Sequence, residues 1–240
     1  MNRLFILIAA LAMCPMAMAQ QQSAVFLGSA GTYAVLSGTT VTNTGPTVVN
    51  GDLGVWPGTA ITGFGPGVVN GSEDAGTVAA QHAQGSLNIA YNDAAARTSV
   101  AITNLAGDIS GQTLAPGLYK STSTLSLAGT VTLSGSGVYI FQIASGLIVG
   151  SGGTVVLSGG ATSDNVFWQV GSSATLGTTA NFKGTILALT SISLATGARL
   201  DGRALAQHGA VTLDTNNVTI PLGGAVLIVL PPPRRHRSSN

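Results

Sequence analysis

The chain has 240 residues, of which 45% are hydrophobic and only 7% are charged, and its formal net charge is +1. An average protein carries roughly 25% charged residues. The balance excludes an intrinsically disordered chain, which needs low hydrophobicity and high net charge. It also gives no basis for electrostatic capture of nucleic acid.

The N-terminus has the three-part pattern of a secretory signal peptide. Arg3 precedes an apolar run from Leu4 to Met13, and Ala17-Met18-Ala19 provides a cleavage site. The run is too short to span a bilayer as a mature helix. We therefore predict a signal peptide over residues 1–19 and a secreted protein. Lipoprotein processing at Cys14, the only cysteine, is a weaker alternative that would leave the protein attached to the cell surface.

An alanine-rich segment from Ser72 to Asp108 predicts one long helix over about residues 73–106. Ser72 can cap its start, and Asp93 with Arg97 forms an i,i+4 pair. A helix of about 30 residues is roughly 45 Å long, so it must lie along something of similar length. Its larger or apolar side chains recur at steps of three and four: Ala79, Ala83, Leu87, Tyr91, Ala94, Thr98, Ala101 and Leu105.

The rest of the chain consists of short β-branched runs separated by Gly, Ser and Thr. Leu176, Leu194 and Leu213 recur at intervals of about 18 to 19 residues. This period predicts a β-solenoid with three strands per coil. Runs such as "VYIFQI" and "VFWQV" are apolar on both faces, so the helix is expected to cover this strand of each coil. The other strands alternate, and their outward residues are small and uncharged.

No constellation of residues points to catalysis. The three histidines, His82, His208 and His236, have no acidic neighbours at catalytic or metal-ligand spacing. We therefore predict no catalytic residue, no metal and no cofactor. Solenoid polysaccharide lyases would need clustered acids for calcium, and the sequence shows none. Trp168 is expected in the core, whereas Trp56 beside Pro57 can be exposed.

The composition changes after Pro221. The segment 221–240 has a short apolar run, Ala225 to Leu230, a proline triplet and three arginines. The apolar run is far too short to span a membrane. We interpret 221–240 as a C-terminal tail, either frayed or the remnant of a surface-sorting signal.

Several stretches, in order, resemble a known family: the secreted ice-binding (antifreeze) proteins with a discontinuous right-handed β-solenoid. The resemblance covers about residues 24–220. It implies a mainly β solenoid of triangular section, one long α-helix packed along one side, and an N-terminal coil joined out of order. The stretches are "LGSAGTYAVLSGTTVTNTGPTVVNGDLGVWPGTAITGF", "AYNDAAAR", "LAPGLYKST", "VYIFQIAS", "FWQVGSSATLG" and "LDGRALAQHGAVTLDTN".

The resemblance also implies a function, adsorption to the surface of ice crystals by a flat Thr/Ser/Ala-rich face, which would inhibit ice growth and recrystallisation. Thr44-Gly45-Pro46-Thr47 and Thr59-Ala60-Ile61-Thr62 match the family's Thr-Ala/Gly-x-Thr/Asn motif, and Thr196 begins a third copy that ends in Arg199. The partner is ice, with no nucleic acid and no membrane span, and the protein is expected to be a monomer. The alternative is a cell-surface adhesive or structural module that binds polysaccharide or protein. The predicted ice-contact set is Thr44, Thr47, Thr59, Thr62, Thr130, Thr132, Thr154 and Thr196.

Overall fold

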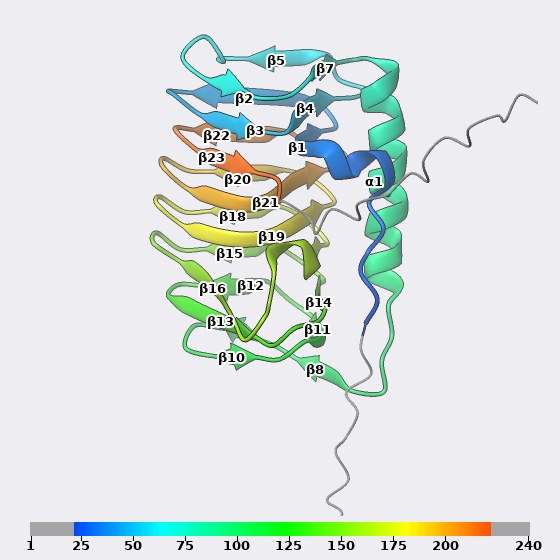
Figure 1. The fold of residues 1–240 in the computed structure, drawn as a ribbon, viewed down its shortest axis with the longest axis vertical. Coiled ribbons are helices and arrows are strands. Elements are labelled where there is room, and N and C mark those ends of the chain that lie inside the picture. The colour runs from blue at the N-terminus through cyan, green and yellow to red at the C-terminus, as the bar shows by residue number, and fades with distance from the viewer. Residues whose placement is uncertain (1–21, 222–240) are drawn as a thin grey trace, which may run out of the picture.

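The computed structural model describes residues 22–221, which form a stack of three-strand coils with one helix along its side (Figure 1). The signal peptide predicted for residues 1–19, Cys14, His236 and the tail after Pro221 lie outside the described residues. Neighbouring strands of the stack pair in parallel. The mainly β solenoid with one helix, predicted from the sequence, is confirmed.

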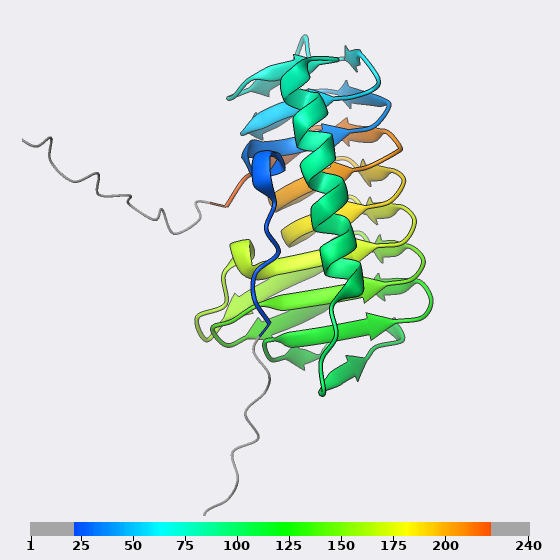
Figure 2. The same cartoon turned by 90° about the vertical axis from the view of Figure 1, so that its right-hand side faces the viewer.

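Each coil contributes to three faces. The first, the helix face, is covered by the α-helix α1 (Val78–Ala96), which runs along the stack in Figure 2. In stack order its strands are β7 (Glu73–Ala75), β4 (Asp52–Val55), β1 (Tyr33–Ser37), the second halves of β21 (Arg199–Ala206) and β19 (Asn181–Ala188), β17 (Val166–Val170), β14 (Tyr139–Ile143), β11 (Gly117–Ser121) and β8 (Ile102–Asn104).

The second face is a separate sheet of eight strands, which we name the threonine face after its outer residues. In stack order it holds β5 (Ala60–Thr62), β2 (Thr40–Thr44), β22 (Val211–Asp214), β20 (Ile192–Leu194), β18 (Ala174–Leu176), β15 (Leu147–Val149), β12 (Leu125–Leu127) and β9 (Gly107–Asp108).

The third face, the charged face, is named after Lys183, Arg199 and Asp201. In stack order it holds β6 (Val68–Val69), β3 (Val48–Asn50), β23 (Asn217–Thr219), the first halves of β21 and β19, β16 (Thr154–Ser158), β13 (Thr130–Ser134) and β10 (Thr113–Leu114). Two short 3-10 helices, Gly28–Thr32 and Ser163–Asn165, lie outside the three faces.

Two long strands join the charged face to the helix face without a break. Asn181 of β19 pairs with β16 on the charged face, while Thr185 of the same strand pairs with β17 on the helix face. Gly184, with φ +103°, lies between them and is in register with Gly202 of β21. A Cβ at Gly202 would lie 1.9 Å from the Gly184 carbonyl oxygen, so this corner requires glycine.

The stack is out of chain order. β1 pairs with β21 and with β4, and β2 lies between β22 and β5. The N-terminal coils are thus placed on the last coil of the chain, as the resemblance implied. Helix α1 and the link that follows it, residues 97–101, then lead from β7 at one end of the stack to β8 at the other (Figure 1).

The helix is shorter than the predicted 73–106. Thr77 caps α1 by accepting a hydrogen bond from the Ala80 amide at 3.2 Å. Residues before Thr77 form β7, where Glu73 pairs with Leu53, and residues after the helix form β8. Strand pairing at the two ends of the stack therefore overrides the helical pattern there. The predicted pair Asp93–Arg97 is confirmed, with a 2.6 Å contact.

Two layers of apolar side chains hold the stack together. Inside the coils, four aromatic rings follow one another along the axis with ring centroids 3.8 to 4.9 Å apart: Tyr119, Phe141 and Trp168 are stacked, and Phe182 is tilted against Trp168. Trp168 is fully buried, as predicted.

The second layer lies between the helix and the helix face, where Leu87 and Ala90 of α1 pack in one cluster with residues such as Phe167 and Leu205. The strand apolar on both sides is thus covered by the helix.

Candidate functional site

The outer surface of the threonine face carries one row of residues in register from coil to coil. Thr62 pairs with Thr42, and Thr42 with Thr212. Seven of the eight members are uncharged, and six of the eight carry a hydroxyl. The row is Thr62, Thr42, Thr212, Ser193, Thr175, Ile148, Ser126 and Asp108.

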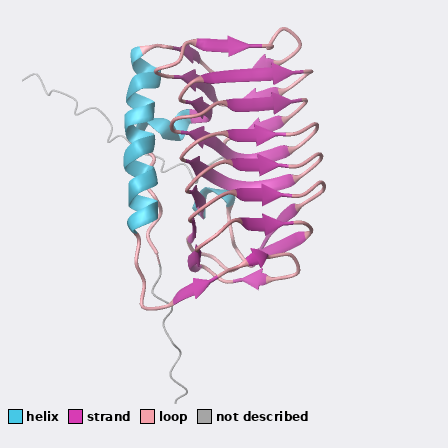
Figure 3. Ribbon diagram, turned by 180° about the vertical axis from the view of Figure 1, so that it is seen from behind, coloured by secondary structure: helices cyan, strands magenta, loops and turns pink. Residues whose placement is uncertain are grey.

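This row faces outward because the residues on either side of it point into the core. Val41, Val211, Ile192 and Leu147 alternate with the outer positions and are fully buried. Parallel strands lie about 4.8 Å apart, so eight strands place the row along roughly 34 Å. The Thr42 hydroxyl lies 3.4 Å from the Thr212 hydroxyl, within reach of a hydrogen bond along the row. The strands appear as parallel rows beside the helix in Figure 3.

Only two of the residues in the strands of the threonine face are charged, and both are held by hydrogen bonds. Asp214 accepts from the hydroxyls of Thr196 and Thr215 at the edge of the face. Asp108 lies on the last strand, β9, where hydrogen bonds from Ser110 and from the Ala128 amide lower its pKa. The middle of the face is therefore free of charge.

The charged face differs in its middle coils. There the outward residues of β19 and β21 include Lys183, Asp201 and Arg199. The Lys183 ammonium lies 3.5 Å from the Asp201 carboxylate. The row that begins with Thr130 and Thr154 continues through Asn181 to the long charged side chain of Arg199. This surface is neither uniform nor uncharged.

The eight threonines of the predicted set do not form one surface. Thr44 and Thr62 are exposed on the threonine face, and Thr59 is exposed just before β5. Thr130, Thr132 and Thr154 lie on the charged face. Thr196 is exposed in the turn after β20, with its hydroxyl bonded to Asp214.

Thr47 is a correction to the predicted set. Its exposure is 0%, and its hydroxyl accepts a hydrogen bond from the Asn216 amide at 3.0 Å. The residue therefore fixes the end of β22 to the start of β3 and has no surface to offer a ligand. The Thr-Gly-Pro-Thr match turns into the core at its last residue.

Sequence reasoning did not single out the central residues of the row. Thr175, Ser193 and Thr212 directly precede Leu176, Leu194 and Leu213, the leucines whose spacing predicted the coil. The repeat thus contained the signal, because the residue before a buried position in a strand points outward. The Thr-Ala/Gly-x-Thr/Asn motif pointed instead to residues in or beside turns.

Among residues 22–221 no group of three or more His, Cys, Asp and Glu side chains could hold a metal ion. His82 is exposed on the helix. None of the helices in this range is long and apolar enough to cross a membrane.

Comparison with known proteins identifies the family. The model of the ice-binding-like family matches residues 35–219. The chain belongs to this family. It is 44% identical over 207 residues to an ice-binding protein of Nostoc sp. (strain HG1), covering 84% of this chain and 76% of that protein. An ice-binding protein of Flavobacterium frigoris (strain PS1) is 41% identical over 212 residues, covering 82% and 76%.

A solved structure supports the same assignment for the fold. The crystal structure of an ice-binding protein from an Antarctic biological consortium superposes with a TM-score of 0.84 at 49% sequence identity. It covers 85% of this chain and 94% of its own. The β-solenoid described above is therefore the fold of an ice-binding-like protein.

Proposed function

We propose that the protein binds ice through the threonine face, and thereby inhibits ice growth and recrystallisation. The observation that carries this proposal is the uncharged row from Thr62 to Ser126, which stays in register across the parallel strands of one sheet. Relatives at 41% and 44% identity that are named ice-binding proteins support the activity.

The side chains of the row suit an ordered water lattice. Each threonine offers a hydroxyl that anchors a water molecule and a methyl group that disfavours disordered hydration. Its β-branched side chain has restricted χ1, so little freedom is lost on binding. A single contact is weak. A row repeated every ~4.8 Å lets many weak contacts act at once on a crystal plane.

The two other faces are poor candidates for the same surface. The helix face is covered by α1. The charged face presents Lys183, Arg199 and Asp201, which retain their own hydration shells and protrude from the sheet. Of the eight threonines named from the sequence, the proposed surface retains Thr44 and Thr62 and adds Thr42, Thr175, Ser193 and Thr212.

We also infer that the protein acts outside the cell as a monomer that is not an enzyme. The signal-peptide pattern of residues 1–19 supports export. A monomer is consistent with the proposal because association of two copies through the threonine face would cover the surface that binds ice. Sizing the purified protein and determining the N-terminus of the exported form, expected at Gln20, test these points. The alternative of an adhesive or structural module receives no support from the relatives.

The direct test is made with purified protein in supercooled water. Thermal hysteresis, faceted ice crystals and slow recrystallisation at micromolar protein are expected. A heat-denatured sample of the same protein provides the control for solute effects. Inactivity of well-folded protein in all three assays would show that the surface does not bind ice.

A further inference from the structure

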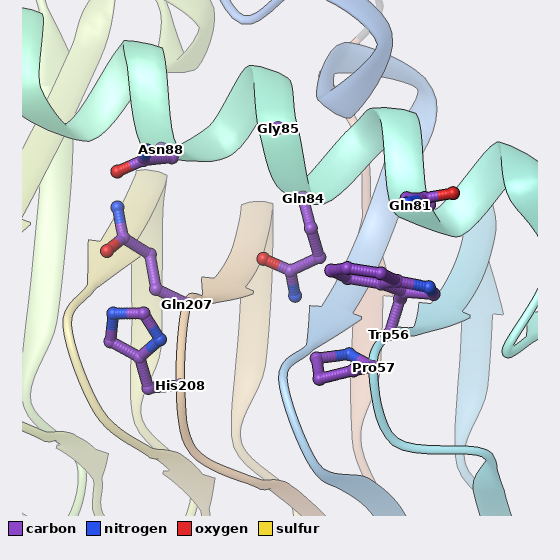
Figure 4. Close-up of a pocket in the computed structure, with 8 residues that line it drawn as sticks. All are labelled: Trp56, Pro57, Gln81, Gln84, Gly85, Asn88, Gln207 and His208. Carbon is purple, nitrogen blue, oxygen red and sulfur yellow. The ribbon is translucent and has the colours of Figure 1, made fainter.

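A pocket lies between the helix and the edge where the helix face meets the threonine face. Its volume is about 400 Å³. Figure 4 shows the helix along one wall and the loops that follow β4 and β21 along the other. Its concave shape sets it apart from the flat row of threonines, so it calls for a different ligand.

A glycine on the helix wall leaves the space open. Trp56, Gly38 and Gln207 directly follow the ends of β4, β1 and β21, which pair side by side. Gly38 carries no side chain, and an added Cβ there would lie 2.3 Å from the Gln207 carbonyl oxygen, so the close approach of the two backbones accounts for this glycine. Opposite them on the helix is Gly85, where an added Cβ would meet no atom within 4 Å.

Gly85 has no structural reason to be glycine. It lies in the middle of α1, where glycine is less favourable than almost any other residue. Neither a positive φ nor a close neighbour requires it. A glycine that weakens the helix and opens a pocket indicates that the open space is used.

Uncharged amides line the pocket. Gln207 is only 6% exposed, and its Nε2 is buried without a hydrogen-bond partner among the described residues. In Figure 4 this amide is directed toward Asn88, an exposed helix residue whose Oδ1 accepts from Asn92. Gln84 donates to the Ala206 carbonyl at 3.1 Å, which holds its amide at the floor. A buried amide without a partner is rare in folded proteins, and a ligand hydroxyl would satisfy it.

The two ends of the pocket are formed by rings. Trp56 and Pro57 form an apolar wall at one end, and His208 lies near the other end. No lysine, arginine, aspartate or glutamate lines the space. The lining therefore selects against ionic ligands, because an ion here would lose its hydration shell without meeting an opposite charge.

We propose that this pocket binds a neutral saccharide. The apolar C–H groups of a sugar ring pack against the Trp56 indole, and its hydroxyls bond to the amides of Gln207 and Asn88. A cavity of about 400 Å³ accepts one or two sugar rings. The proposal does not depend on ice binding, since the pocket lies off the row of threonines.

Tryptophan fluorescence gives a direct test, because the chain has two tryptophans and Trp168 is fully buried. Trp56 is therefore the reporter. Titration with maltose, cellobiose or trehalose, three uncharged disaccharides, is expected to give a saturable change in emission with at least one of them. Glycerol at equal mass concentration controls for bulk solvent effects.

Two variants locate the site. Gly85→Leu fills the pocket with a good helix former and is expected to weaken binding about tenfold or more. Gln207→Leu removes the buried amide and is expected to weaken binding while leaving the thermal midpoint unchanged or raised. The matched control is Ile89→Leu, at an exposed helix position outside the pocket.

Saturation-transfer NMR repeats the comparison without relying on Trp56 emission, and circular dichroism verifies folding of each variant. Absence of a saturable response to all three sugars overturns the proposal. Equal affinity in the wild type and in a folded Gly85→Leu or Gln207→Leu variant overturns it as well. Thermal hysteresis measured on the same samples reports separately on the threonine face, so failure of one proposal is not mistaken for failure of the other.

Discussion

The two uncovered faces of the stack are built from the same kind of strand but present different surfaces. Thr130 and Thr175 both alternate with buried residues and both point outward. Across the coils, however, the row of Thr130 continues through Thr154 to Asn181 and Arg199. The row of Thr175 continues through Ser193 to Thr212. A hydroxyl-bearing strand therefore does not make a uniform surface unless its neighbours in register also lack charge.

The two faces also differ in how their side chains bind water. A charged side chain holds a hydration shell whose water positions do not match those of an ice plane. A threonine orders water only through its single hydroxyl. Lys183 and Asp201 form an exposed ion pair in the middle of one face. The other face confines its two carboxylates to its edge and its last strand. The predictions below compare the two faces through matched changes.

The largest effect is expected from a lysine in the middle of the threonine face. Thr212→Lys places a long charged side chain between Thr42 and Ser193. Ice shaping and thermal hysteresis should be abolished. The free energy of unfolding should change by no more than about 0.5 kcal/mol, because the position is exposed. Thermal hysteresis and urea unfolding measure the two quantities.

The matched variant is Thr132→Lys in β13 of the charged face, which should retain thermal hysteresis. If Thr132→Lys abolished activity while Thr212→Lys retained it, the assignment of the two faces would be reversed.

Alkaline pH should remove activity only by unfolding the stack. Burial raises the pKa of Tyr119 from 10.0 to about 12, and burial also raises the pKa of Tyr139. Because the folded pKa lies above the unfolded one, the neutral phenols contribute stability fully below about pH 10. That contribution is lost as the pH rises through about 12. Threonine hydroxyls do not titrate in this range.

Thermal hysteresis is thus expected to stay constant from neutral pH until circular dichroism reports unfolding. A change in hysteresis while the protein is still native would implicate a charged side chain instead of the hydroxyl row.

A smaller gain is expected from completing the row. Ile148 is 52% exposed and interrupts the hydroxyls between Thr175 and Ser126. Ile148→Thr keeps the β-branched shape and restores a hydroxyl, so ice affinity should rise modestly. Ice-plane affinity assays with labelled protein can resolve the change. Val156→Thr, on the charged face of the same coil, provides the comparison and should have no effect.

The smallest effect is expected from removing the ion pair of the charged face. The double variant Lys183→Thr and Asp201→Thr should leave thermal hysteresis unchanged, because these side chains lie off the binding row. The loss of stability should be at most about 1 kcal/mol, since exposed ion pairs contribute little. A clear rise in activity would mean that the charged face can bind ice once its charges are removed.

Local pattern predicted the coil and the position of the helix, whereas the out-of-order N-terminal coil was implied only by the family resemblance. The spacing of Leu176, Leu194 and Leu213 predicted the coil, and the double-sided apolar strands predicted where the helix lies. The limits of the helix were wrong because residues such as Glu73 and Ile102 pair with strands that lie far away in the sequence. Helical periodicity cannot report such pairing.

Deciding which of the two uncovered faces is uniform and uncharged requires the register of the strands from coil to coil. In the sequence, Thr130 is as acceptable a surface residue as Thr175. Only the pairing of Asn181 with Arg199, and of Lys183 with Asp201, places charges beside the rows of Thr130 and Thr132. The burial of Thr47 likewise depends on Asn216, which is distant in the chain.

Helix α1 and residues 97–101 connect the two ends of the stack, so the length of this connection is tied to the number of coils. One extra coil lengthens the stack by about 4.8 Å, which corresponds to about three helical residues. Three residues do not complete a turn, so the buried stripe of α1 would rotate away from the sheet. Two extra coils need about 9.6 Å, and seven residues supply about 10.5 Å in nearly two whole turns. Enlargement that lengthens α1 in step with the stack is therefore expected to proceed by pairs of coils, so the helix limits the sizes that the threonine face can take.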